Sequence, residues 1–146
     1  MKNIETRKKA LADYTGKNDI KYDADFEAFV LPDGRMYKVF TDAEADQAAE
    51  EDIMNSLWAF NADFILDHSK AADDLSGRER DEVLNALQEM QSKLCESATP
   101  LVRCLIADLN EFIDDAIRAD GRGHFIAQYD GDEIDLGCDL YAYRID

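Results

Sequence analysis

FEAFVLPDGRMYKVFTDAE, the stretch from residue 26 to residue 44, contains the strand, turn and helix signals that decide the fold. Aromatic and β-branched residues at 26–30 and 36–40 flank Pro32-Asp33-Gly34, which is typical of a β-hairpin. Thr41 and Glu44 then have the spacing of a capping box, in which each side chain accepts from the other residue's backbone amide. The stretch therefore predicts two antiparallel strands followed at once by a helix.

Apolar residues recur at helical spacing elsewhere in the chain. We expect a short helix over residues 4–14 that stops at Gly16, and a stripe in the helix after Thr41 that continues to Phe60. Residues 61–68 then form either a further helical turn or two or a buried connection. The widest apolar face runs from residue 102 to 117, after an N-terminal cap and proline at 99–100. Because only residues 96–98 separate this helix from the one predicted over 79–95, the two should form an antiparallel hairpin.

The C-terminal segment predicts a second pair of strands, at 124–129 and 139–144, around an acidic turn at 130–135. The expected fold class is α+β: three to four helices, with a central helical hairpin packed on a small antiparallel sheet made from an N-terminal and a C-terminal strand pair. Whether both pairs share one sheet is left open. The length of 146 residues suits a single domain, residues 1–146, with a short, slightly basic N-terminal helix within 1–20.

The charge of the chain is strongly negative, at −17 from 33 Asp and Glu against 16 Lys and Arg. The first 20 residues carry five basic against three acidic side chains, so the excess lies beyond them. Hydrophobic residues make up 46% of the chain, so the acidity does not predict disorder. A surface of this sign argues against nucleic acid or an anionic membrane as a direct ligand.

Acidic residues are densest in residues 41–60, which contain no Lys or Arg. Asp42, Asp46 and Glu50 recur at every fourth position, which places their carboxylates about 6 Å apart along a helix axis. Such a row imitates the phosphates of a nucleic-acid strand, whereas the simpler interpretation is that the acids only keep the protein soluble. The candidate partner-binding residues are Asp42, Glu44, Asp46, Glu50, Glu51, Asp52, Asp73, Asp74, Asp130, Asp132, Glu133 and Asp135.

Signatures of common enzymes are missing from the sequence: it has no phosphate-binding glycine loop, no nucleophile elbow and no zinc-binding His pair. His68 and His124 each lie near acidic residues in sequence, which keeps a small hydrolase as a third hypothesis. Residues 130–135 resemble a calcium loop only superficially, because Ile134 stands where a third oxygen ligand is needed and Gly131 is misplaced. We predict no catalytic residues, no metal site and no cofactor, and we expect the three cysteines to be reduced and mostly buried.

Two further motifs stand out in the sequence: Leu57-Trp58-Ala59-Phe60-Asn61, and residues 120–125 followed by Tyr129-Asp130-Gly131 and Tyr143-Arg144. Together with Thr41 and the Ala/Asp/Glu run after it, they resemble a group of small, uncharacterised bacteriophage and prophage proteins. The resemblance implies a phage context, in which small acidic proteins often antagonise host restriction enzymes or CRISPR effectors, several of them as DNA mimics. It carries over no catalytic residues. From the residues themselves, Gly121 and Gly123 indicate a tight turn that Arg122 holds by pairing with a nearby acid.

The first hypothesis is therefore a non-enzymatic phage inhibitor of the anti-CRISPR type. Its acidic surface mimics DNA and blocks the basic nucleic-acid-binding channel of a host defence protein, in the host cytoplasm. The alternative is an adaptor or oligomerisation module that uses an apolar helical face, which an exposed patch of Met54, Trp58 and Phe60 would favour. Since no apolar run reaches the ~20 residues of a membrane span, we expect no membrane association. A homodimer is compatible with either hypothesis.

Overall fold

The computed structural model describes residues 3–146, whose contacts divide the chain into two compact units. The first unit is Met1–Glu50 together with Asp120–Asp146, and the second is Glu51–Ala119. One boundary falls inside the helix that follows Thr41, and the other falls at the end of a later helix. The α+β class is confirmed, and the expectation of a single domain remains a prediction.

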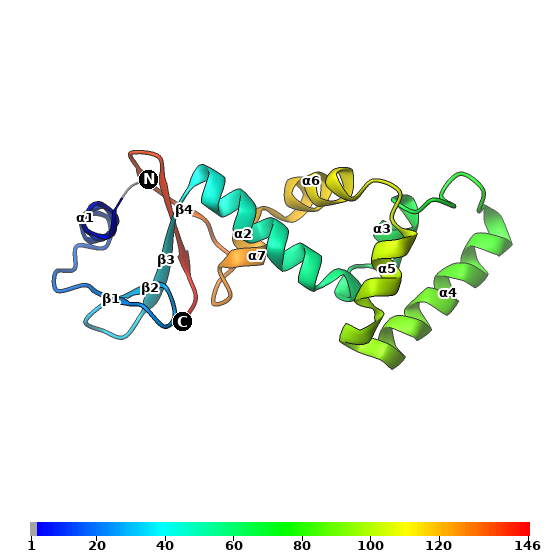
Figure 1. Ribbon diagram of the computed structural model, residues 1–146, viewed down its shortest axis with the longest axis horizontal. Coiled ribbons are helices and arrows are strands. Elements are labelled where there is room, and N and C mark those ends of the chain that lie inside the picture. The colour runs from blue at the N-terminus through cyan, green and yellow to red at the C-terminus, as the bar shows by residue number, and fades with distance from the viewer. Residues whose placement is uncertain (1–2) are drawn as a thin grey trace. The chain divides into compact units, whose positions relative to one another are not determined.

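A five-stranded antiparallel sheet forms the centre of the first unit, with the strand order β1-β2-β3-β5-β4 (Figure 1). The pairing of Tyr37 with Arg144 through Thr41 with Leu140 joins the N-terminal and C-terminal strands. The two parts of the chain therefore share one sheet. Its strands are β1 (Lys21–Asp23), β2 (Ala28–Val30), β3 (Met36–Thr41), β4 (Ile134–Gly137) and β5 (Leu140–Arg144).

The helix that packs on this sheet is α1 (Ile4–Thr15), and it ends at Gly16 as the sequence predicts. Gly16 adopts a left-handed conformation with φ 68° and donates its amide to Ala12. Leu11 is fully buried against alternate residues of β3 and β5, among them Val39 and Leu140. The prediction that a helical hairpin packs on the sheet is therefore not confirmed.

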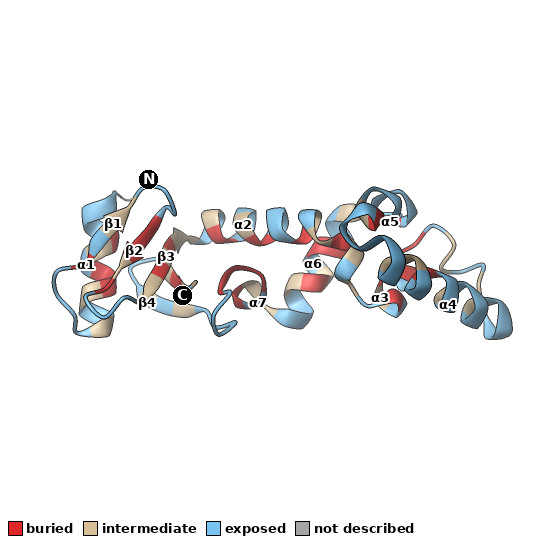
Figure 2. Cartoon of the chain, turned by 90° about the horizontal axis from the view of Figure 1, so that it is seen from below, coloured by how far each residue is buried: buried red, intermediate tan, exposed pale blue. Residues whose placement is uncertain are grey.

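The helix α2 (Asp42–Asn55) begins directly after β3, and the predicted capping box forms. The amide of Thr41 donates to Glu44 Oε1 at 2.9 Å, and the amide of Glu44 donates to Thr41 Oγ1 at 3.3 Å. Ala45, Ala49 and Ile53 are fully buried, and they form a stripe along one side of the helix (Figure 2). The acidic residues of α2 lie outside this stripe.

The prediction of a strand at 124–129 is wrong, because the short helix α7 (Arg122–Ile126) occupies the first half of that stretch and residues 127–129 form no strand. The partner of β5 is instead β4, which begins within the expected acidic turn. The turn of this hairpin consists of Cys138 and Asp139, with φ values of 47° and 60°. Positive φ at both turn residues is the geometry that two-residue hairpins prefer, although neither residue is a glycine.

The second unit is helical along the described residues, and its core contains Ile53, Leu57, Ile65, Val102 and Phe112. The predicted helical turns before His68 are α3, and the predicted helix over 79–95 is α4. On α4 only Leu87 is buried, so much of the helix surface is exposed (Figure 2). The elements are the 3-10 turn η1 (Leu57–Ala59), α3 (Ala62–Asp67), α4 (Gly77–Leu94), η2 (Cys95–Ala98), α5 (Thr99–Leu105) and α6 (Leu109–Asp120).

The single long helix predicted through residues 102–117 is wrong, because the chain breaks between α5 and α6. Ile106 is extended, with φ −72° and ψ 127°, and forms a bridge with Ser69. The amide of Lys70 donates to Leu105 at 2.9 Å, and the amide of Ala107 donates to His68 at 2.8 Å. Contacts with a segment distant in sequence thus satisfy the backbone groups that the break leaves without helical partners.

Cys95, Cys104 and Cys138 are all exposed, which contradicts the expectation of buried thiols. Two of them occupy backbone turns, since Cys95 has φ 49° and Cys138 has φ 47°. Among residues 3–146, no helix is both long enough and apolar enough to cross a membrane.

Candidate functional site

Arg122, the first residue of α7, gathers three carboxylates of the first unit. Its Nη1 atom lies 2.7 Å from Asp42 Oδ1 and 3.0 Å from Asp46 Oδ1, and its Nε atom lies 2.8 Å from Glu133 Oε1. The guanidinium also lies 4.9 Å from the centre of the Tyr141 ring, within range of a cation–π contact. The arginine side chain is only 12% exposed, so it works as an internal clamp between α2 and the loop before β4.

The electrostatics of this cluster favour its charged form. Burial alone would lower the pKa of Arg122, but hydrogen bonds to Glu133, Asp42 and Asp46 outweigh it, and the net pKa lies above the ordinary value. The buried Tyr143 hydroxyl donates to the same Glu133 oxygen as Arg122 Nε. Burial, followed by the Glu133 carboxylate, raises the pKa of Tyr143. Glu133 Oε1 therefore accepts hydrogen bonds from two donors, Arg122 and Tyr143.

Two glycines place Arg122 in this position. Gly121 has φ 83°, so the chain turns sharply between α6 and α7. Gly123 is buried, and a Cβ atom there would lie 2.5 Å from the Gly131 carbonyl oxygen and 2.8 Å from the Glu133 nitrogen. Only a residue without a side chain allows the loop that carries Glu133 to come this close to α7.

We call Asp42, Asp46, Glu50, Asp132 and Glu133 the acidic surface. Asp42, Asp46 and Glu50 follow one another at four-residue spacing on α2, and all three are exposed. The side chains of Asp42 and Asp46 remain 67% and 61% exposed even though both pair with Arg122. One buried cation thus holds three carboxylates in place, and the cluster keeps a net negative charge toward solvent.

Glu44 does not belong to this surface. Its carboxylate pairs with Arg7 at 2.9 Å and closes the capping box with Thr41. Burial alone would raise the pKa of the Glu44 carboxyl. The hydrogen bonds from Thr41 and Arg7 outweigh this effect, so the net pKa lies below its usual value. In the structure Glu44 therefore anchors the start of α2 through its contacts with Arg7 and Thr41.

The remaining candidate acids do not gather at the Arg122 cluster. Asp130 lies in the loop before β4 and accepts a hydrogen bond from the Asp132 amide, and Asp135 lies in β4 and accepts one from the Gly137 amide. Glu51, Asp52, Asp73 and Asp74 belong to the second unit. The first unit carries 10 Lys and Arg against 18 Asp and Glu, a net of −8, and the second carries 6 against 15, a net of −9. Charge alone therefore does not single out a surface.

His68, in the second unit, is held at both ring nitrogens. Its Nδ1 atom lies 2.9 Å from the Phe64 carbonyl oxygen and its Nε2 atom lies 2.8 Å from Asp115 Oδ2. Both partners accept hydrogen bonds, so an imidazolium that donates from both nitrogens fits this geometry best. Burial alone would lower the pKa of His68, but the hydrogen bonds to Asp115 and Phe64 raise it overall. Neither nitrogen is left for a substrate, which weakens the hydrolase hypothesis.

The His68 contacts predict a pH-dependent stability. Because the pKa of the folded state lies above the unfolded value of 6.5, the contribution is complete below that pH and is lost as pH rises through the folded pKa. Urea unfolding of wild type and of His68→Gln should show a stability difference that shrinks as pH rises above about 6.5. His124→Gln, at an exposed position, is the control and should leave the pH profile unchanged. A difference that grows with pH would contradict the assigned contacts.

Among residues 3–146, no group of three or more His, Cys, Asp or Glu side chains is arranged to hold a metal ion. Comparisons with protein-family models, with curated proteins and with solved structures found no match.

Proposed function

We propose that the protein is a non-enzymatic inhibitor whose acidic surface occupies the basic nucleic-acid-binding channel of a partner protein. The observation that carries the proposal is the Arg122 cluster, which fixes Asp42, Asp46 and Glu133 together while the α2 carboxylates stay exposed. A fixed row of carboxylates loses little conformational freedom on binding, which favours association. Lys and Arg side chains that normally contact phosphates would contact this row instead.

The sequence resemblance supplies the biological setting of the proposal. A phage-encoded inhibitor acts in the cytoplasm of the host, and a host defence protein such as a CRISPR effector has the required basic channel. The net charge of −17 supports fast, salt-sensitive association with such a channel.

The structure determines which acids should be changed to test this function. Asp42, Asp46 and Glu133 hold Arg122, so their reversal would damage the first unit as well as its charge. Glu50 and Asp132 are exposed and form no ion pair with any residue of 3–146. The test variant is therefore Glu50→Lys with Asp132→Lys. Its matched control is Asp13→Lys with Asp25→Lys, which makes the same change in net charge at exposed positions of the same unit.

Binding is measured first to a purified, DNA-free CRISPR effector, and then to proteins captured from nuclease-treated bacterial lysate. The test variant should bind at least about tenfold more weakly than wild type, since two contacts of about 1 kcal/mol each change sign. The control should lose much less, because long-range attraction is largely screened in ~0.15 M salt. Circular dichroism checks that both variants keep their fold. Equal losses of affinity in the two variants would show that net charge alone accounts for the binding. That result would refute binding through a defined surface.

A second candidate function, an adaptor or oligomerisation module, is favoured by exposed apolar residues in the second unit. The predicted patch of Met54, Trp58 and Phe60 is only half-buried. The large apolar side chains exposed on α4 and α5 are instead Val83, Leu94, Leu101 and Leu105, which are 38–50% exposed. Self-association that persists at ~1 M salt and disappears in Leu101→Ser with Leu105→Ser would support this function.

A further inference from the structure

A cavity of about 600 Å³ lies between α1 and the sheet of the first unit, on residues that the acidic surface does not use. This volume falls within the range of about 300–1,000 Å³ that is typical of ligand-binding pockets. Its lining combines aromatic and apolar side chains with carboxylates: Asn3, Ile4, Glu5, Arg7, Tyr22, Glu27, Phe29, Val39, Phe40 and Glu44.

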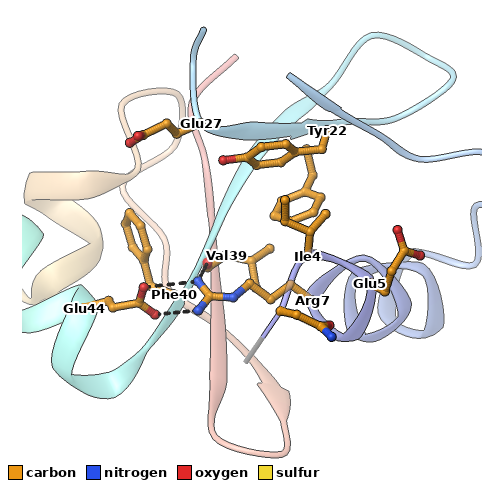
Figure 3. Close-up of a pocket in the computed structure, with 10 residues that line it drawn as sticks. Ile4, Glu5, Arg7, Tyr22, Glu27, Val39, Phe40 and Glu44 are labelled. Carbon is orange, nitrogen blue, oxygen red and sulfur yellow. Dashed lines mark hydrogen bonds and ion pairs between the residues drawn. The ribbon is translucent and has the colours of Figure 1, made fainter. Parts of the chain in front are cut away.

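Arg7 and Glu44 form a closed pair in the wall of the cavity. Arg7 Nη2 lies 2.9 Å from Glu44 Oε1, and Arg7 Nη1 donates to the Val39 carbonyl oxygen at 2.8 Å. Figure 3 shows this pair on one side of the cavity, with Tyr22 and Glu27 on the other side. Since the pair is neutral as a whole, Glu5 and Glu27 decide the sign of the charge in the cavity.

Both of these carboxylates are available to a ligand. Glu27 is exposed and forms no ion pair with any residue of the described chain, 3–146. Glu5 is 80% exposed, and its contact with Lys8 is long, at 3.6 Å. Within residues 3–146, the Glu27 carboxylate is therefore without an ion-pair partner, while Glu5 makes a long contact with Lys8. Negative charge beside aromatic rings is a combination that attracts a cation.

The aromatic wall favours a planar cation over a compact one. The rings of Tyr22 and Phe29 lie 5.1 Å apart at 55°, and both Tyr22 and Phe40 are half-buried, so part of their surface faces the cavity. A guanidinium stacks on such rings and forms two parallel hydrogen bonds with a carboxylate, which an ammonium group does not do.

We propose that this cavity receives an arginine side chain of the basic partner. The inference rests on the proposed function, because that function supplies a partner rich in exposed arginine. It adds a second contact: the acidic surface contacts the basic channel, and the cavity selects one side chain by its shape and planarity. Specificity for one partner among many basic proteins would then come from this cavity.

The probe for the cavity is the peptide acetyl-Gly-Arg-Gly-amide, titrated into the full-length protein and followed by the backbone amide signals in NMR spectra. The neutral comparison is the same peptide with citrulline, which keeps the shape of arginine but not its charge. The arginine peptide should shift the signals of Tyr22, Glu27 and Phe40 and bind about tenfold more tightly than the citrulline peptide. Glu27→Gln should weaken this binding about threefold, whereas Asp25→Asn, a nearby acid outside the cavity, should not change it.

Shifts spread evenly over the acidic residues, or equal binding of the two peptides, would overturn the cavity proposal. A Glu27→Gln protein that binds the arginine peptide like wild type would overturn it as well. The variant with Glu50→Lys and Asp132→Lys keeps every cavity residue and should bind the peptide normally, so the two proposals fail independently. If that variant binds the partner as tightly as wild type does, the acidic-surface proposal is wrong. If the arginine peptide does not bind selectively in the titration, the cavity proposal is wrong.

Discussion

Replacing Arg122 with methionine should lower the free energy of unfolding by about 2–4 kcal/mol. The substitution keeps an apolar stem but removes the cation that pairs with Asp42, Asp46 and Glu133. Loss of one partner of a buried ion pair costs about 3–5 kcal/mol, and the exposure of the two aspartates reduces the cost because water screens them. Urea unfolding followed by circular dichroism measures the change.

The matched control for this prediction is Arg78→Met, which removes the same charge from an exposed pair with Glu82 on α4. The Arg78 side chain is 91% exposed, so the change should stay within about 0.5 kcal/mol. The stability of Arg122→Lys should lie between those of wild type and Arg122→Met, since an ammonium group does not span the three carboxylates as a guanidinium does. Equal stabilities of Arg122→Met and Arg78→Met would show that the cluster does not hold the first unit together.

Gly123→Ala should destabilise the protein by about 2–3 kcal/mol, although alanine is the better helix former by about 1 kcal/mol. The added Cβ would lie 2.5–2.8 Å from backbone atoms of Gly131, Asp132 and Glu133, and backbone atoms have no rotamer with which to move away. The loop must shift, and Glu133 shifts with it away from Arg122. The expected result is therefore a loss of stability together with a weaker Arg122 cluster.

A double-mutant cycle separates this mechanism from a simple clash. If Gly123→Ala acts partly through Glu133, its cost should be smaller in the Arg122→Met background, so the two changes should not add. Gly34→Ala is the control: its φ of +91° strains any side chain, but nothing lies within 4 Å of the added Cβ atom. Gly34→Ala should lower the free energy of unfolding by about 1–2 kcal/mol, and this loss should add fully to the loss caused by Arg122→Met. Strict additivity for Gly123→Ala would contradict the link between the close approach and the cluster.

Features of the fold that depend on neighbouring residues could be predicted from the sequence. The turn at Pro32-Asp33-Gly34, the capping box of Thr41 and Glu44, and the stop at Gly16 each require only residues within a few positions. The structure has all three.

Features that depend on distant residues could not be predicted. The break at Ile106 lies inside an apolar pattern of helical period, and it exists because residues 68–70 supply its hydrogen-bond partners. Residues 124–129 read as a strand because Phe125 and Ile126 have high strand propensity, but the close packing of Gly123 holds α7 in place. In both cases tertiary contacts override the local pattern.

The candidate site was predictable only in part, for the same reason. The row of Asp42, Asp46 and Glu50 follows from helical spacing, and the pairing of Arg122 with a nearby acid, Glu133, follows from its position in a turn. The contacts of Arg122 with Asp42 and Asp46 join residues about 80 positions apart, so no local sequence pattern predicts them. The inward direction of Glu44 depends in the same way on Arg7.

The central claim is that a fixed acidic surface, and not net charge, occupies the channel of a partner. The most direct measurement is the dissociation constant of the purified partner for the variant with Glu50→Lys and Asp132→Lys and for its control with Asp13→Lys and Asp25→Lys, at two salt concentrations. The account predicts at least about tenfold weaker binding for the first variant, near wild-type binding for the control, and weaker binding of both at higher salt. Equal affinities of the two variants would contradict it.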